Sequence, residues 1–485
     1  MKTKLVVCCD GTSNSEYLGE DRSPLTNVSR ISRAIRPSQG DCRQVVLYLP
    51  GIGTDENNPL NSWNQGLGIG LISQIKKAYT FLCHNYCDET DDDIILIGFS
   101  RGAFAVRCIM DLVLKKGLLY KENLHHFPDL FQEWMHSPRN NDDTSETDSD
   151  EADPDETDLD KTNSIVRKPN IRVCALWDSV NSVGFPRPWP LNRGKPTMGF
   201  VDSRLPNGVE NAFQAISLFE HRFHFHPIVL RRPKKGKCVL EQCWFPGYHG
   251  DIGGGNKTEA LAHFALAWMI VKLRTFLSID ETALWSRGNG ELTWVLPKIQ
   301  DPYYSWFGWK AAGSAHRQPR IEFWDADGIY SANVRRLAPQ YNAKEDFSRE
   351  KIHASVRFMS QNGYLKNHFD KSRSLRGISP IMEGGRWVWV LSLYTVIRGW
   401  EWVKSWFVKT KPTGVDYKLW EAGLEGEEQD VLVAWAENDQ ELLLAPENTL
   451  PGAKDPETMT VNFRAWVADP FNNPRLQSAG ASTGT

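Results

Sequence analysis

The chain has 485 residues with 56 Lys and Arg against 60 Asp and Glu, a formal charge of −4, and 41% of its residues are hydrophobic. That apolar content is sufficient for a large core and excludes global disorder. The charge is unevenly distributed. Eleven acids and no base lie between Asp142 and Asp160, so the other residues carry 56 basic against 49 acidic side chains, a net +7.

Short apolar runs predict buried parallel strands in the first half, because continuous Val/Ile/Leu stretches suit strands covered on both faces. Helical patterns lie between several of these runs. The alternation predicts an α/β fold with a mostly parallel sheet flanked by helices, and a functional site beyond the carboxyl ends of the strands. The expected strands are 4–9, 44–49, 93–98, 171–177 and 239–245, and the expected helices are 27–35, 66–86, 103–116 and 259–276.

The strand and helix alternation predicts one α/β domain over residues 1–280. The composition predicts a Trp-rich C-terminal or lid region over 281–475 and a flexible tail over 476–485. The acidic stretch 142–163 has the composition of a disordered, solvated insertion, with a regulatory or partner-binding role as the alternative. In Trp387–Val408 the uninterrupted apolar stretch is too short to span a bilayer. Core or lid packing and an interfacial membrane contact are the two interpretations of that segment.

The nine scattered cysteines show neither a disulfide framework nor a paired zinc-binding spacing, which indicates a reducing compartment. No secretory signal peptide is recognised, so a cytoplasmic location is expected. His221, His224 and His226 lack acids or cysteines at ligand spacing, and no metal is expected there. No Walker A or Rossmann loop is present, so no nucleotide cofactor is expected, and no nucleic-acid partner is predicted either.

The strongest local signal is Gly98-Phe99-Ser100-Arg101-Gly102, between a predicted strand and a predicted helix. A G-x-S-x-G sequence in that context is typical of a nucleophile elbow, which exposes the serine hydroxyl on a strained turn. The start of the helix would offer the Arg101 N–H to a developing oxyanion. We therefore predict that Ser100 is a nucleophile.

A serine nucleophile requires a base and an acidic residue that orients it. His249 follows the predicted strand 239–245 in a glycine-rich loop, and Asp178 follows the strand 171–177. The chain order Ser100, Asp178, His249 is that of the α/β-hydrolases. Asp251 is the competing acid, with a loop-capping role equally open to it.

The second oxyanion donor is expected from a Gly loop after a strand. Residues 10–14 and residues 51–54 both qualify, and we favour the amides of Gly11 and Thr12 in the first loop. Arg231-Arg232-Pro233-Lys234-Lys235-Gly236-Lys237 carries five cations, which would suit either a solvated hairpin or an anionic lipid surface.

Four motifs, at 10–14, 98–104, 176–180 and 246–255, together resemble an α/β-hydrolase domain family of unknown function whose bacterial members include the type VI secretion phospholipase effectors. The resemblance covers roughly residues 1–280. The acidic insertion and the Trp-rich half look more like the fungal members. The resemblance implies a serine lipase or esterase with Ser100, Asp178 and His249 as nucleophile, acid and base.

These observations predict a serine hydrolase that cleaves acyl esters, with a lipid or phospholipid favoured as substrate and a peripheral contact with anionic membrane. A thioester or peptide substrate would use the same mechanism. The alternative from a different class is a catalytically silent α/β-hydrolase scaffold for binding or regulation. The distance between Ser100 and a histidine discriminates between a hydrolase and a silent scaffold.

Overall fold

The computed structural model describes most of the first 280 residues and selected later stretches. The described residues are 1–11, 25–51, 66–136, 165–180, 201–256 without 202, 223–224, 226 and 234–235, 260–280, 283–284, 299, 301–302, 317, 349–383 without 362, 364, 372–374 and 376–377, 386–397 and 409–422. The acidic insertion 142–163 lies outside these residues. The predicted domain boundaries remain a prediction.

Six strands of the first half form a parallel sheet in the order β3-β1-β4-β7-β8-β9. Their carboxyl ends therefore share one edge, where an α/β site is expected. The strands are β1 (Thr3–Cys9), β3 (Cys42–Leu49), β4 (Asp93–Phe99), β7 (Val173–Trp177), β8 (Asn211–Ser217) and β9 (Val239–Phe245). The short β2 (Ser38–Gln39) pairs antiparallel with β3 at the edge.

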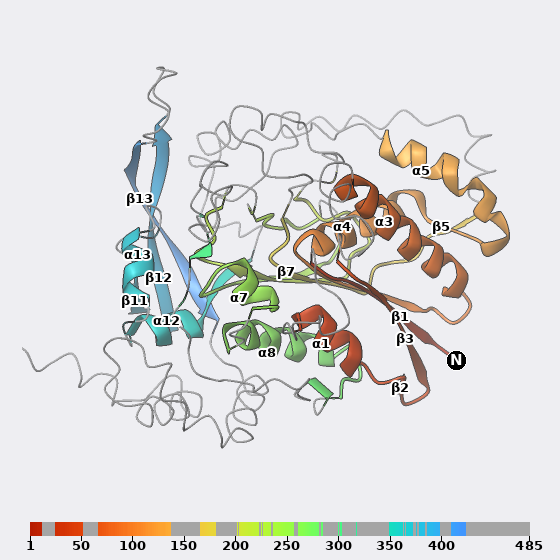
Figure 1. Cartoon of the computed structure of the whole chain (residues 1–485), viewed down its shortest axis with the longest axis horizontal. Helices are drawn as coiled ribbons and strands as arrows, with labels where there is room; N and C mark the ends of the chain where they lie inside the picture. The colour runs from red at the N-terminus through yellow and green to blue at the C-terminus, as the bar shows by residue number, and fades with distance from the viewer. Residues whose placement is uncertain are drawn as a thin grey trace, which may run out of the picture.

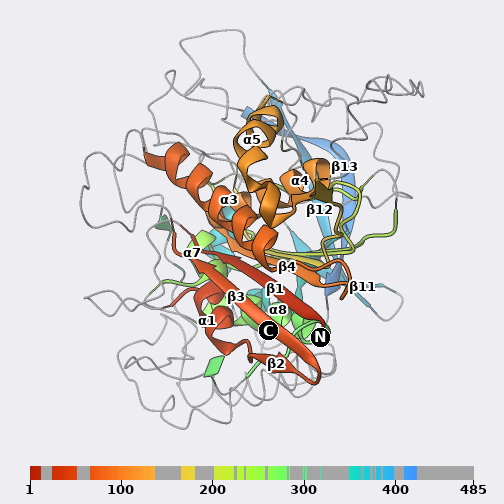
Figure 2. The ribbon, with the colours of Figure 1, turned by 90° about the vertical axis from the view of Figure 1, so that its right-hand side faces the viewer.

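Helices cover both faces of this sheet (Figure 1). α1 (Asn27–Ala34) and α8 (Ala260–Arg274) lie on one face, and α3 (Gly66–Asn85) and α4 (Ser100–Lys116) lie on the other, as the turned view in Figure 2 also shows. Alternate residues of β1 point to opposite faces. Val6 and Cys8 join the hydrophobic cluster that contains α1 and α8, whereas Leu5 and Val7 join the cluster that contains α3 and α4. The α/β fold with a mostly parallel sheet is thus confirmed.

A small hairpin and two short helices follow α4. They are β5 (Leu118–Leu119), paired antiparallel with β6 (Val166–Arg167), the 3-10 helix η1 (Lys121–His126) and α5 (Phe127–Met135). The buried Arg167 joins them to α3, because its guanidinium donates to the carbonyls of Cys83 at 2.9 Å and Leu119 at 2.7 Å.

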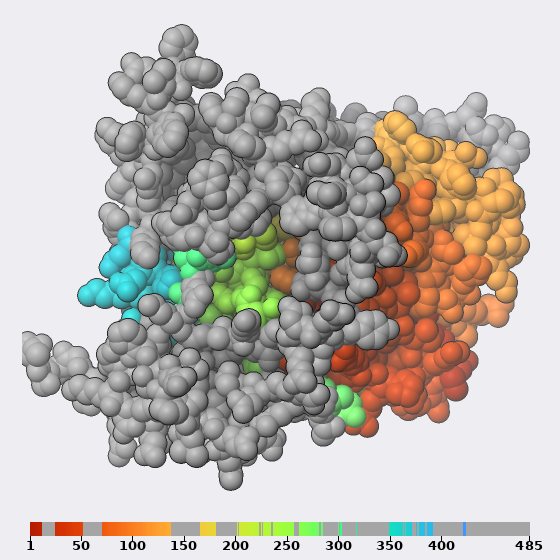
Figure 3. All heavy atoms as spheres, in the orientation of Figure 1, coloured from red at the N-terminus to blue at the C-terminus, as the bar shows by residue number. Residues whose placement is uncertain are grey.

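Strands from the later part of the chain continue the same sheet beyond β9. β10 (Glu350–His353) pairs parallel with β9, and β13 (Lys409–Ala422) pairs parallel with β10. β12 (Arg386–Ile397) and β11 (Ser379–Glu383) follow antiparallel, giving eleven strands in all among the described residues. α12 (Ala354–Gln361) and α13 (Lys366–Lys371) lie at this end, on the opposite side of the molecule from the described part of the first 135 residues (Figure 3).

The described tryptophans of the Trp-rich segment pack against the fold. Trp389 is fully buried, and its Nε1 donates to Glu421 at 3.3 Å. The guanidinium of Arg357 lies 4.6 Å from the Trp387 ring and pairs with Glu421 at 3.0 Å. The contacts of Trp387 and Trp389 therefore favour core packing over membrane contact. Trp400, Trp402 and Trp406 lie outside the described residues. Within the part of the chain that the structure describes, no helix is long and apolar enough to cross a bilayer.

The strand β8 was not predicted from the sequence, although it lies between two predicted strands. Its sequence is NAFQAIS, in which Gln214 interrupts the apolar run. The Gln214 amide is buried and donates to the Gln242 side chain of β9 at 2.9 Å. A polar pair that is hydrogen-bonded across neighbouring strands can be buried, but its polar residue interrupts the apolar run by which a strand is predicted.

Candidate active site

Ser100 lies at the turn from β4 into α4 with a φ of +59°, in the left-handed region that a serine rarely adopts. Two glycines permit this tight turn. A Cβ on Gly102 would lie 2.3 Å from the carbonyl oxygen of Cys9, and a Cβ on Gly98 would lie 2.7 Å from the Cα of Ala103. The turn packs the start of α4 against the carboxyl end of β1.

The first turn of α4 has amides with no acceptor inside the helix, as every helix start does. Phe99, the residue before the helix, makes no side-chain capping bond to them. The Arg101 N–H is one of these amides, one residue after Ser100. Burial also lowers the pKa of the Arg101 guanidinium to about 10.

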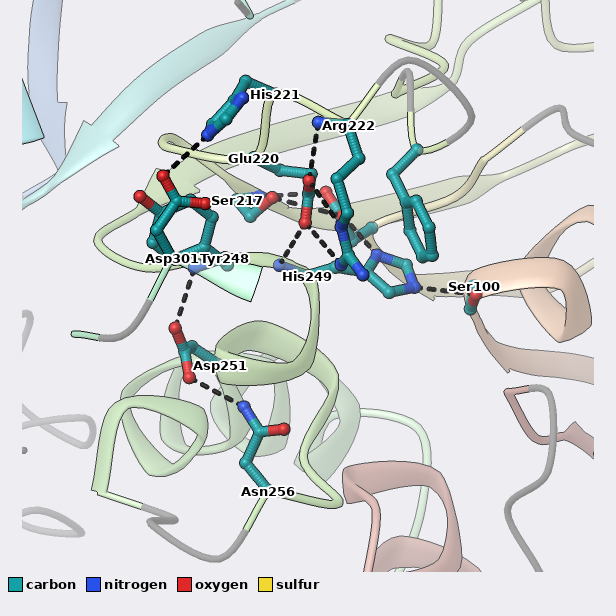
Figure 4. Close-up of polar contacts among 12 residues, drawn as sticks. Ser100, Ser217, Glu220, His221, Arg222, Tyr248, His249, Asp251, Asn256 and Asp301 are labelled. Carbon is teal, nitrogen blue, oxygen red and sulfur yellow. Dashed lines mark hydrogen bonds and ion pairs between the residues drawn. The ribbon is translucent and has the colours of Figure 1, made fainter. Parts of the chain in front are cut away.

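His249 begins α7 (His249–Gly253), four residues after β9 ends. Its Nε2 lies 2.7 Å from the Ser100 Oγ, and both residues are buried. Figure 4 shows the imidazole directed at the serine across the gap between the two helix starts. In the neutral ring, a proton on Nδ1 leaves Nε2 free to accept from the hydroxyl.

Two aromatic rings enclose the imidazole. Phe99 is 4.8 Å from it between ring centroids, and Phe225 meets it edge-on at 4.7 Å. A Cβ on Gly253 would lie 2.0 Å from the Phe99 ring, so only glycine leaves room for that ring here. Packing thus restricts the imidazole to the orientation that faces Ser100.

Asp178 follows β7 and supplies the acid beside the imidazole. Its Oδ2 lies 2.6 Å from Nδ1 of His249, and its side chain is fully buried. The backbone N–H of Ser217 donates to Oδ1 at 2.9 Å. The structure therefore brings together the three residues that the sequence predicted, Ser100, His249 and Asp178, in one hydrogen-bonded line.

Arg317, which sequence reasoning missed, forms an ion pair with Asp178 and stabilises its charged form. Burial alone would raise the pKa of this carboxyl, but the guanidinium of Arg317 and the hydrogen bond from His249 outweigh burial and hold it well below its usual range. Nη1 of Arg317 lies 2.5 Å from Oδ1. Asp178 is thus ionised at neutral pH.

Asp251, the competing acid, is not in contact with the imidazole nitrogens. Its carboxylate accepts from the Tyr248 N–H at 2.8 Å and from Asn256 at 2.8 Å (Figure 4). Burial raises its pKa to about 6, and these neutral donors lower it only in part. Asp251 therefore caps the loop that starts α7.

The predicted oxyanion loop begins at a buried carboxylate. Asp10 accepts from Tyr48 at 2.6 Å and from Thr26 at 2.7 Å, and burial raises its pKa to about 6. The Gly11 N–H donates to Asp10 at 2.6 Å and is already engaged. Thr12 and Gly53 lie outside the described residues.

A second charged pair lies beside His249 and was also missed. Arg222 pairs with the buried Glu220 at 2.7 Å, and Glu220 accepts from the His249 N–H at 3.3 Å. Burial would raise the pKa of Glu220, but Arg222 reduces it to about 2. Burial also lowers the pKa of His249, an effect that Asp178 partly opposes.

The missed residue Ser217 ends the unpredicted strand β8, and Glu220 and Arg222 follow it, so placing that strand would have found all three. Of the histidine cluster, His221 contacts Asp301 at 2.9 Å, and the other two histidines lie outside the described residues. Among the residues that the structure describes, no group of His, Cys, Asp and Glu could hold a metal.

The geometry provides a hydroxyl, a base that can accept its proton and a carboxylate that fixes the base. This is the set of groups that nucleophilic acyl transfer requires.

Comparison with known proteins gives two kinds of relative. An uncharacterised protein of Saccharomyces cerevisiae (strain ATCC 204508 / S288c) is 28% identical over 237 residues, covering 46% of this chain and 32% of the yeast protein. The solved structure of the Tle1 effector bound to the VgrG spike of the type 6 secretion system is 16% identical, with a TM-score of 0.31, over 53% of this chain and 51% of that one. An uncharacterised protein from Pseudomonas aeruginosa is 17% identical, with a TM-score of 0.31, over 56% and 46%.

The chain therefore spans about a third of the length of its yeast relative and about half of each structural one. Residues 3–272, more than half of the chain, match the family described as the T6SS phospholipase effector Tle1-like catalytic domain. The chain belongs to the family of Tle1-like phospholipase effector catalytic domains.

Proposed function

We propose that the protein is a serine hydrolase that cleaves acyl esters of lipids through an acyl-enzyme. The observation that carries the proposal is the line of contacts from Ser100 through His249 to Asp178, at 2.7 Å and 2.6 Å. A silent scaffold would leave the serine beyond reach of a histidine, and the 2.7 Å contact counts against that alternative.

In the first half-reaction the Ser100 Oγ attacks the ester carbonyl while Nε2 of His249 takes its proton. The tetrahedral oxyanion accepts from the Arg101 N–H and from an amide of the loop after β1. Because the Gly11 N–H already donates to Asp10, we propose the Thr12 N–H as the second donor to the oxyanion. His249 then protonates the leaving alcohol, and water, activated by the same base, releases the acid.

Asp178 acts by keeping the proton of the neutral imidazole on Nδ1 and by stabilising the imidazolium that forms. Burial lowers the pKa of His249, so the base is unprotonated over most of the physiological range. We expect the acid limb of the pH–rate profile to lie below the pKa of about 6.5 of free histidine.

A lipid, and a phospholipid in particular, is proposed as the substrate because the family is one of phospholipase effector domains. The net +7 of the chain outside the acidic insertion would favour an anionic lipid surface. Deleting residues 142–160 should then strengthen binding to anionic vesicles. Unchanged binding would remove the proposed competition between the insertion and the membrane.

The decisive experiment labels the protein with a fluorophosphonate probe and measures fatty-acid release from phospholipid vesicles by mass spectrometry. We expect Ser100→Ala to abolish both signals without loss of the fold. Ser355→Ala is the matched control, since Ser355 also lies 2.7 Å from a buried histidine, His353, but outside the proposed machinery. Labelling of Ser100→Ala at the wild-type level would exclude Ser100 as the nucleophile. Labelling without fatty-acid release would exclude phospholipid as the substrate.

A further inference from the structure

Arg317 is almost fully buried, with 1% of its side chain exposed, and its guanidinium lies against the Asp178 carboxylate. Nη1 is 2.5 Å from Oδ1 and Nη2 is 3.0 Å from Oδ2, so the two groups meet edge to edge through two parallel contacts. This bidentate arrangement fixes direction as well as charge. A single point charge in the same place would leave the carboxylate free to rotate.

The same guanidinium also donates hydrogen bonds to the residues that contact Asp178 and His249. Nη1 donates to the Ser217 carbonyl at 2.9 Å and to its Oγ at 2.6 Å, and Ser217 itself donates its N–H to Asp178. Nη2 donates to the carbonyl of Phe225, whose ring packs against the imidazole of His249. One side chain therefore connects the acid, its neutral donor and the ring that orients the base.

Within the part of the chain that the structure describes, two ion pairs lie beside His249. Glu220 is paired with Arg222, and Asp178 is paired with Arg317. The two carboxylates and two guanidiniums balance, so the imidazole faces no net charge from them when it is neutral. Without Arg317 it would face one uncompensated carboxylate at 2.6 Å, which stabilises the imidazolium.

We propose that Arg317 is a positioning residue of the hydrolase: it holds the Asp178 carboxylate against Nδ1 of His249 and offsets its charge, so that His249 stays a neutral base in mildly acidic solution. This inference rests on the proposed function. It also assigns a part of the site to a residue beyond the family match, which ends at residue 272.

The test measures the second-order rate constant of fluorophosphonate labelling of the full chain from about pH 5 to about pH 9. In Arg317→Met we expect the plateau rate to fall roughly 10- to 100-fold, because the acid loses its fixed orientation. We also expect the acid limb to move to higher pH by about one unit, because the imidazolium gains stability. Arg317→Lys keeps the positive charge but loses the bidentate contact with the carboxylate. The acid limb of the pH–rate profile should therefore return to its wild-type position, while the plateau labelling rate stays as low as in Arg317→Met.

Two further variants separate positioning from a general loss of structure. In the Asp178→Asn background, Arg317→Met should cause no further loss of the residual rate, because Arg317 acts through Asp178. Arg357→Met is the matched control, since Arg357 and Glu421 form another buried ion pair, 4% and 2% exposed, away from the proposed machinery. It should reduce stability and leave the acid limb unchanged.

An Arg317→Met profile that superimposes on the wild type after scaling would overturn the electrostatic part of the proposal. A further loss of rate in the Asp178→Asn background would overturn action through Asp178. Either result, with Ser100 still labelled in the wild type, would leave the proposed function intact. Absence of Ser100 labelling in the wild type would instead remove the proposed function.

Discussion

Asp178 and Asp251 are both buried carboxylates close to His249, and their hydrogen-bond donors differ in charge. Asp178 accepts from a guanidinium, an imidazole and a backbone amide, whereas Asp251 accepts from neutral donors, the Tyr248 amide and the Asn256 side chain. Burial raises the pKa of both carboxyls. Arg317 reverses the effect at Asp178, and nothing of comparable strength does so at Asp251, where the pKa rises to about 6.

The difference shows why proximity in sequence is a poor guide to the acid of a Ser-His-Asp arrangement. Asp251 is two residues from His249, yet Asp178, which is 71 residues away, contacts Nδ1. A cation and several donors together offset the loss of hydration and hold the pKa of a buried acid below its usual range. The position of a counter-charge decides between two such candidates.

The largest expected effect comes from exchanging each acid for its amide. Asp178→Asn should lower kcat/KM by roughly 10⁴-fold, since the amide favours the wrong tautomer of the imidazole. Asp251→Asn should lower it less than about 10-fold, because only a loop cap is altered. Steady-state hydrolysis of a chromogenic ester measures both. Equal losses in the two variants would make Asp251 part of the acid–base machinery.

The pH dependence of stability should differ next most. The folded pKa of Asp251, about 6, exceeds its ordinary 3.8, so the folded state binds the extra proton and stability falls as pH rises from about 4 to about 6. Roughly two pKa units correspond to about 3 kcal/mol. Urea unfolding at both ends of that window should show a smaller fall in Asp251→Asn than in wild type. Asp178 contributes with the opposite sign, because its lowered pKa stabilises the fold above its ordinary pKa and the contribution is lost on acidification.

A smaller effect is expected from the glycine that makes room beside the imidazole. Gly253→Ala places a methyl group in the Phe99 ring, so the free energy of unfolding should fall by about 1–3 kcal/mol. The labelling rate of Ser100 should fall as well, because Phe99 positions His249. Differential scanning calorimetry and labelling measure the two effects. A stable variant with a normal rate would show that the α7 turn tolerates movement of Phe99.

The smallest effect should come from Ser217→Ala. The Ser217 hydroxyl lies 3.2 Å from Oδ2 of Asp178, and the backbone amide that also holds this carboxylate is unaffected by the change. We expect a loss of about 3- to 10-fold in kcat/KM, because the guanidinium and the amide still hold the carboxylate. A loss as large as that of Asp178→Asn would place the hydroxyl ahead of the guanidinium in holding the acid.

The sequence predicted the elements and residues that follow local patterns. Apolar runs located β1, β3, β4, β7 and β9, and the glycine pattern around Ser100 located the tight turn between β4 and α4, because tight turns impose glycine at fixed positions. Asp178 and His249 were found from their places after predicted strands. Their positions could be predicted because the carboxyl ends of parallel strands meet at one edge of the sheet, where the site of an α/β fold lies.

The remaining part of the site depends on contacts that no local pattern records. β8 was missed because Gln214 is buried as one of a pair with Gln242, and Ser217, Glu220 and Arg222 were missed with it. Arg317 lies 139 residues from Asp178 in sequence. Only the folded chain shows that this arginine, among many expected at the surface, is buried beside the carboxylate that it stabilises.

The pairing of β9 with β10 bears on how the family domain can be handled in isolation. A chain that ended at residue 272 would keep every residue of the matched region, but the backbone groups of Gln242 and Trp244 would lose their partners in β10. β9 would become a bare sheet edge, open to pairing with another chain, and Asp178 would lose its guanidinium. Such a truncated protein should self-associate as aggregates, although its Ser, Asp and His are all present.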